Sequence, residues 1–193
     1  MNTGSVAILG LASILASASA SHAQLRAVPG AEWRNERYGY ELSMPAGTTL
    51  CMGPEDSSAF DPLMIPVQAI TPCGDLSQLF MIQNRVVVDA YYDTDQYENL
   101  GQYASALCES LARIRLVASA TIRRAGGLLG GLETMICELQ LLDGYFVKVA
   151  VARKAGRDAA PINFSVSVEA PIDEKPEAEA LWWNAVGSFQ LIR

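Results

Sequence analysis

The scarcity of histidine limits the catalytic and metal-binding chemistry that this chain can support. The chain has one histidine, His22, and it lies in an apolar N-terminal segment. Ser-His-Asp and Cys-His catalysis both need an imidazole in the folded domain, and histidine metal sites need one too. Because that segment is expected to be removed on export, these chemistries are disfavoured for the mature protein.

Acidic residues supply the best remaining candidate for a catalytic or metal site. Four carboxylates fall within ten residues, at the expected end of a strand and start of a helix: Asp89, Asp93, Asp95 and Glu98. Oxygen ligands suit Ca²⁺, but the spacing does not match an EF-hand loop. Acids at a helix N-terminus also cap it and complement its dipole. We favour capping and expect no metal or other cofactor.

Aromatic residues are the candidates for binding. Adjacent positions on a helix lie about 100° apart, so Trp182 and Trp183 cannot share one narrow face. We expect one indole to pack on the sheet and the other to reach the surface, where tryptophan often anchors a partner. Tyr91 and Tyr92 could line a pocket in the same way, although such residues more often belong to the core and its rim.

The N-terminal segment, residues 1–23, is typical of a signal peptide. Val6 to Leu15 is apolar and is followed by small residues. It is too short to span a bilayer, which takes about 20 apolar residues, and a small-x-small site ends it. Cleavage before Gln24 is favoured over cleavage before Ser21. The usual basic residues at the start are missing, since the first Lys or Arg is Arg26. The sequence predicts a periplasmic or secreted protein without a membrane span.

The expected export of the protein indicates that its four cysteines form disulfides. An even number of cysteines in an oxidising compartment indicates disulfides, and no Cys-x-x-Cys or Cys/His spacing supports zinc. Three pairings are possible. We favour Cys51–Cys73, which closes a loop-rich segment, and Cys108–Cys137, whose helix and strand faces are both expected to point inward.

Composition excludes two classes of partner. Hydrophobic residues make up 50% of the chain and charged residues 18%, which suits a globular domain and argues against disorder. The formal net charge is −7. Nucleic acid and anionic membranes need concentrated positive charge, so neither is expected. A basic protein or small-molecule ligand would be a suitable partner.

The elements alternate between strand and helix patterns in one domain, residues 38–193, after a polar lead-in over residues 24–37. Strands are expected over 38–44, 63–70, 85–92, 119–124, 132–142, 145–153 and 162–168, with a loop over 46–61 that contains Cys51. Helices are expected over 97–112, capped by Asp95 with Glu98 or by Asn99 with Gln102, and over 174–186. Asp143-Gly144 predicts a type I′ hairpin turn. Strands with helices packed on an antiparallel sheet define an α+β class with two main helices.

This layout resembles the PsbP-like fold. The opening strand Tyr38-Gly39-Tyr40-Glu41-Leu42-Ser43-Met44-Pro45-Ala46 has an aromatic-Gly-aromatic start and a terminal proline. The helix over 97–112, a Gly-rich turn, the hairpin at Asp143-Gly144 and a closing helix ending in Ser188-Phe189 follow the same order. The resemblance covers residues 38–190. It implies a non-enzymatic binding or assembly protein, although a fold does not determine function.

The residues therefore favour a non-enzymatic exported binding or interaction protein. One concrete form would be an immunity protein that neutralises an effector of a type VI secretion system, because such proteins are small, acidic, exported and disulfide-bonded. The alternative is a histidine-free carboxylate-based hydrolase, since paired carboxylates can cleave glycosides.

The signal peptide gives the first testable prediction. The exported protein should begin at Gln24, because the Ser21-His22-Ala23 site is the favoured one. Intact mass spectrometry of the exported protein measures this directly. Exported material that retains residues 1–23 would contradict the cleavage.

Overall fold

The protein is described here from a computed structural model, which covers residues 26–28, 30–52, 63–67, 73, 85–93, 97–114, 116–155 and 160–192. The segment expected to be a signal peptide, residues 1–23, lies outside the described residues. The elements, in chain order, are β1 (Arg26–Val28), β2 (Glu32–Asn35), β3 (Tyr40–Ser43), β4 (Leu50–Met52), β5 (Leu63–Pro66), β6 (Arg85–Tyr92), α1 (Leu100–Ile114), β7 (Val117–Arg124), β8 (Thr134–Leu141), β9 (Tyr145–Lys154), β10 (Ile162–Pro171), the 3₁₀ turn η2 (Ile172–Glu174), α2 (Lys175–Ser188) and β11 (Gln190–Leu191).

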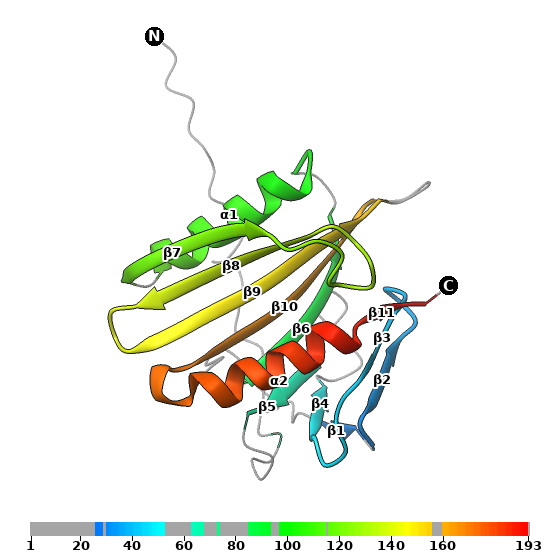
Figure 1. The fold of residues 1–193 in the computed structure, drawn as a ribbon. Helices are drawn as coiled ribbons and strands as arrows, with labels where there is room; N and C mark the ends of the chain where they lie inside the picture. Colours follow the sequence, from blue (N-terminus) through cyan, green and yellow to red (C-terminus); the bar gives the residue numbers. More distant parts are fainter. Residues whose placement is uncertain are drawn as a thin grey trace, which may run out of the picture.

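Antiparallel pairing organises the described strands into two four-stranded sheets and one of three strands. The first has the order β1-β4-β5-β6 and the second β10-β9-β8-β7. The two four-stranded sheets meet where β6 runs beside β10, and we call them together the main sheet. At this junction the Asp93 amide donates to the Pro161 carbonyl at 2.7 Å. The small sheet has the order β11-β3-β2. Helix α1 covers one face of the main sheet, and α2 and the small sheet lie over the other (Figure 1).

Alternation along the strands creates a core on each face of the main sheet. On β9, Val147, Val149 and Val151 face α1, and Lys148 points to the α2 side. On β10, Phe164, Val166 and Val168 belong to the α2-side core. Because successive side chains point to opposite faces of a strand, a sheet covered on both sides needs apolar residues at nearly every position. The sequence of β9 meets this need.

The α1 side is fixed by a helix cap and a disulfide. Helix α1 begins at Leu100, three residues later than predicted, and the Asn99 side chain accepts the Gln102 amide at 3.0 Å. The expected Asn99 cap is therefore present, while Asp95, the first residue of the alternative cap, lies outside the described residues. Cys108 of α1 is joined to Cys137 of β8, with Cα atoms 5.9 Å apart. Cys51 and Cys73 form the second bridge, so the pairs are those that the sequence favoured.

Several expected elements were wrong in detail. The segment 24–37, expected as a polar lead-in, contains strands β1 and β2, and the loop over 46–61 contains β4. These strands have three or four residues and gain their stability from sheet partners, so their local pattern is weak. Because proline has no amide hydrogen, Pro66 predicts an edge strand or a bulge for the strand expected over residues 63–70. Strand β5 instead pairs with both β4 and β6, and Pro66 lies at its end.

The β8–β9 turn also differs from the prediction. Leu142, Asp143 and Gly144 separate the two strands, so the loop has three residues instead of two. Gly144 adopts a φ of 85°, the left-handed conformation that such three-residue hairpins require at their last position.

A glycine of the Gly-rich turn allows the C-terminal strand to close the fold. Gly130 has a φ of 59°, and a side chain there would meet the Leu191 Cγ atom at 2.8 Å and the Leu191 backbone nitrogen at 3.1 Å. No other residue type fits without displacing β11. The turn thus has a packing role, in addition to linking β7 to β8.

The disulfide between α1 and β8 gives a prediction about stability. Replacing both cysteines (Cys108→Ser with Cys137→Ser) should lower the free energy of unfolding by about 3–4 kcal/mol, because the bridge restricts the unfolded chain. Urea unfolding followed by circular dichroism measures the change. A double variant as stable as the wild type would show that the bridge does not constrain the fold.

Candidate functional site

The tandem tryptophans lie on α2 and separate as their helical spacing requires. Trp182 is 0% exposed and its indole N–H donates to the Val166 carbonyl of β10 at 2.8 Å. Trp183 is 41% exposed. Their rings meet edge to face, with centroids 4.7 Å apart. One indole therefore anchors the helix to the sheet, and its neighbour is held at the surface against it.

A buried lysine lies between these rings. The ammonium of Lys148 is 4.9 Å from the ring centre of Trp182 and 5.1 Å from that of Trp183. It also contacts the Glu179 carboxylate at 2.7 Å and Glu138 at 3.9 Å. A cation on an aromatic face gains most when it is desolvated, and a buried charge needs a partner. We call Lys148, Glu179, Trp182 and Trp183 the tryptophan cluster.

Lys175 extends the tryptophan cluster along α2. Its ammonium contacts Glu138 at 3.3 Å and lies 5.3 Å from the ring centre of Phe146. Each element thus contributes one lysine and one glutamate: Lys175 and Glu179 lie on α2, and Lys148 and Glu138 lie on the sheet. This charge pattern fixes the rotation of α2 and, with it, the side of the molecule on which Trp183 is exposed.

The predicted tyrosines do not join the tryptophan cluster. Tyr91 and Tyr92 are consecutive on β6 and therefore face opposite sides of the sheet. Tyr91 packs edge-on against Tyr103 of α1, with ring centres 6.1 Å apart. The Tyr92 ring lies 5.3 Å from that of Tyr38, and its hydroxyl donates to the Arg37 carbonyl at 3.2 Å. The four aromatic residues predicted to bind are therefore in three separate places.

Burial determines the chemistry of the tyrosines under α1. Desolvation raises the pKa of the Tyr91 hydroxyl and, more strongly, the pKa of the Tyr103 hydroxyl. Both phenols stay protonated at physiological pH, so neither is suited to act as a general base there. They are best understood as the polar edge of the α1-side core.

The carboxylates singled out in the sequence are only partly within the described structure. Asp93 forms an ion pair with Arg153 of β9 at 2.8 Å, with both side chains largely buried. Asp89 lies on β6, Glu98 just before α1, and Asp95 outside the described residues. Within the described ranges, no group of three or more His, Cys, Asp or Glu side chains is placed to hold a metal ion.

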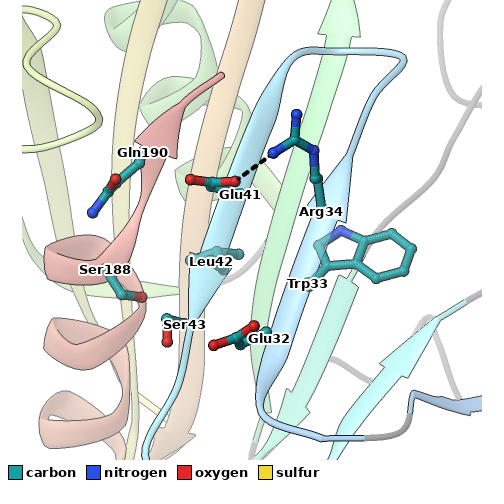
Figure 2. A pocket seen from close by; sticks show the side chains of 8 residues that line it. All are labelled: Glu32, Trp33, Arg34, Glu41, Leu42, Ser43, Ser188 and Gln190. Carbon is teal, nitrogen blue, oxygen red and sulfur yellow. Dashed lines mark hydrogen bonds and ion pairs between the residues drawn. The ribbon is translucent and has the colours of Figure 1, made fainter. Parts of the chain in front are cut away.

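A polar groove on the small sheet was missed by the sequence analysis. Figure 2 shows its lining, which comes from β2, β3, the end of α2 and β11. The hollow has a volume of about 480 Å³ and is lined by Glu32, Trp33, Arg34, Glu41, Leu42, Ser43, Ser188 and Gln190. Arg34 pairs with Glu41 at 3.1 Å, and its hydrogen bond to Glu36 raises the guanidinium pKa. The polar–aromatic alternation of Glu32-Trp33-Arg34 could have identified β2. These ion pairs are exposed and contribute little stability.

Comparisons with known proteins find similarity in structure but none in sequence. No protein-family model matches the sequence, and no curated protein matches it. In structure, the chain is similar to cyanobacterial PsbP (CyanoP) from Synechocystis sp. PCC 6803, with a TM-score of 0.50 and 12% identity over 92% of this chain and 98% of that one. It is also similar to LpqN, described as involved in cell envelope biogenesis of Mycobacterium tuberculosis, with a TM-score of 0.47 and 10% identity over 89% and 92%.

The class of protein that these observations define is a PsbP-like α+β domain. The expected resemblance is confirmed at the level of the fold, including the large antiparallel sheet and the two main helices. Identity this low carries no activity or partner across. Among the described residues, no helix is both long enough and apolar enough to cross a membrane.

Lys148 gives a prediction about the tryptophan cluster. Lys148→Met should lower the free energy of unfolding by about 2–4 kcal/mol, because it removes two cation–π contacts and leaves a half-buried carboxylate without its nearest cation. It should also shift the tryptophan emission spectrum. Lys154→Met, on the same strand β9 and half-buried, is the control and should change neither. Equal effects of the two substitutions would contradict the role given to Lys148.

Proposed function

We propose that this protein is a non-enzymatic, exported binding protein that captures a protein partner with the surface around Trp183. The observation that carries the proposal is that Trp183 is exposed and yet held in one orientation by its neighbours. Its ring is 41% exposed yet held by Trp182 and Lys148. A large side chain that is already ordered loses little conformational entropy on binding, and tryptophan is among the residues most often found as a binding anchor.

Three further observations support this role. The two disulfides suit an oxidising compartment outside the cytoplasm. The acidic balance of the chain, with a net charge of −7, would speed association with a basic partner. The PsbP-like fold is compatible with binding or assembly. A narrower form of the proposal is an immunity protein that neutralises a secreted effector, tested by growth of cells that express both proteins.

Substituting the two tryptophans one at a time tests the proposal. Trp182→Ala should cost about 3–5 kcal/mol of stability, because it empties a buried site and removes the hydrogen bond to Val166. Trp183→Ala should stay folded, with a loss of less than about 1 kcal/mol, but should weaken capture of the partner by about 2 kcal/mol or more. Thermal melts and titration against a partner isolated from periplasmic extract measure the two effects.

The control separates stability from binding. Leu128, half-buried in the turn after β7, can be changed to Ala and should leave the affinity for the partner unchanged. The proposal fails if Trp183→Ala melts like the wild type and still binds the same partner with unchanged affinity.

A further inference from the structure

Three exposed aliphatic side chains form a row across one end of the main sheet. Leu142 follows β8, and its amide donates to the Leu116 carbonyl at 2.9 Å, so the two residues lie opposite each other. Ile172 follows β10, and its amide donates to the Gly144 carbonyl at 2.8 Å. In Figure 1 this is the end where β7 begins, β8 turns into β9 and α2 starts. Leu116, Leu142 and Ile172 are called the aliphatic row.

The register places the aliphatic row on the α2 side of the sheet. Leu141 and its partner Val117 pack in the α1-side core, so Leu142 and Leu116, each one residue further along, face the opposite side. Ile172 lines a hollow beside α2 together with Phe146. The row is thus on the same side of the main sheet as α2, and it lies beside the start of the helix that carries Trp183.

The exposure of the aliphatic row is high. Leu116, Leu142 and Ile172 are 78%, 67% and 44% exposed. One exposed leucine is ordinary on a protein surface, but three brought together by pairing from different segments make a patch, and such patches mark interaction sites. The hollow that Ile172 borders has a volume of about 130 Å³. That is close to the roughly 150 Å³ of a cavity that admits benzene, so it has room for one inserted side chain.

Acidic residues flank the aliphatic row at Leu142 and Ile172. Asp143 lies in the hairpin turn beside Leu142, Asp173 and Glu174 follow Ile172, and Glu177 lies on the first turn of α2. The nearby cation on α2, Lys175, is already paired with Glu138. On the Leu116 side, Arg115 precedes Leu116 in the sequence, and Arg113, in the last turn of α1, is paired with Glu109. An apolar centre with a carboxylate rim complements a surface with an apolar centre and a basic rim.

We propose that the aliphatic row and its acidic rim are a second part of the docking surface for the partner that Trp183 anchors, and that this partner is a protein with a basic rim around an apolar contact. The inference depends on the proposed binding function and adds the chemistry of the partner. An anionic bilayer is disfavoured, because the carboxylates would repel it. A second copy is disfavoured too, since a two-fold contact would bring the acidic rims together.

A photo-reactive amino acid in the full-length chain tests the inference. p-Benzoylphenylalanine is placed at Leu142 in the producing cell, with Ile122, an exposed residue on the α1 side of β7, as the control position. The protein crosslinked at Leu142 is identified, purified and titrated against the wild type and against Leu142→Ser with Ile172→Ser. We expect a partner with a basic surface whose affinity falls at least tenfold in the double variant and decreases as NaCl is raised. Ile122→Ser should bind as the wild type does.

Other outcomes overturn the inference. A crosslink only to another copy of this chain, only to lipid, or to nothing excludes the proposed occupant, as does a partner whose affinity the double variant leaves unchanged. If that partner still depends on Trp183, the binding function stands and only the role of the aliphatic row fails. If photo-probes at Leu142 and at Trp183 both capture no protein, the proposed function fails as well. Circular dichroism of each variant confirms that it is folded.

Discussion

The burial of Trp182 is the constraint on which the α2 side of the protein depends. Its indole is enclosed between the helix and β10, and the hydrogen bond to the Val166 carbonyl fixes how far along the strand the helix lies. On the sheet below the helix, Lys148 is buried against the two indole rings and the Glu179 carboxylate. The next residue, Trp183, is turned outward by helix geometry alone. A single buried ring thus determines the position of the exposed one.

The other face of the sheet is held by different means. Helix α1 contributes apolar residues and one covalent bond, from Cys108 to Cys137, and this side also holds one largely buried ion pair, between Asp93 and Arg153. The α2 side, which carries charges close to its core, has no disulfide among the described residues. Breaking a buried ion pair is costly, but such pairs favour one arrangement over others only when their partners fit. The arrangement of α2 thus depends on noncovalent contacts between charges and rings, whereas helix α1 is also joined to the sheet by a disulfide.

The sequence predicted the secondary structure correctly where the alternation of apolar and polar residues extended over a whole strand. β6 was expected over residues 85–92 and occupies them, and the alternation of Val147, Lys148 and Val149 in the sequence matches the two faces that these side chains take on β9. Short strands such as β2 and β4 were missed, because pairing across the sheet, not local pattern, stabilises them. The exposure of one tryptophan followed from the spacing of Trp182 and Trp183. The Lys148 contacts and the aliphatic row depend on register between distant strands, which no single segment encodes.

The pairing of β11 with β3 has a consequence for how the chain folds. Gln190 pairs with Glu41, and the Phe189 ring stacks on Tyr40 with centres 5.1 Å apart. This contact closes a loop of roughly 150 residues, and loop-closure entropy must be overcome before such contacts stabilise the fold. Neither disulfide spans that loop, since they join residues 22 and 29 positions apart. The disulfides therefore place no covalent constraint on the pairing of β11 with β3, which depends on noncovalent contacts alone.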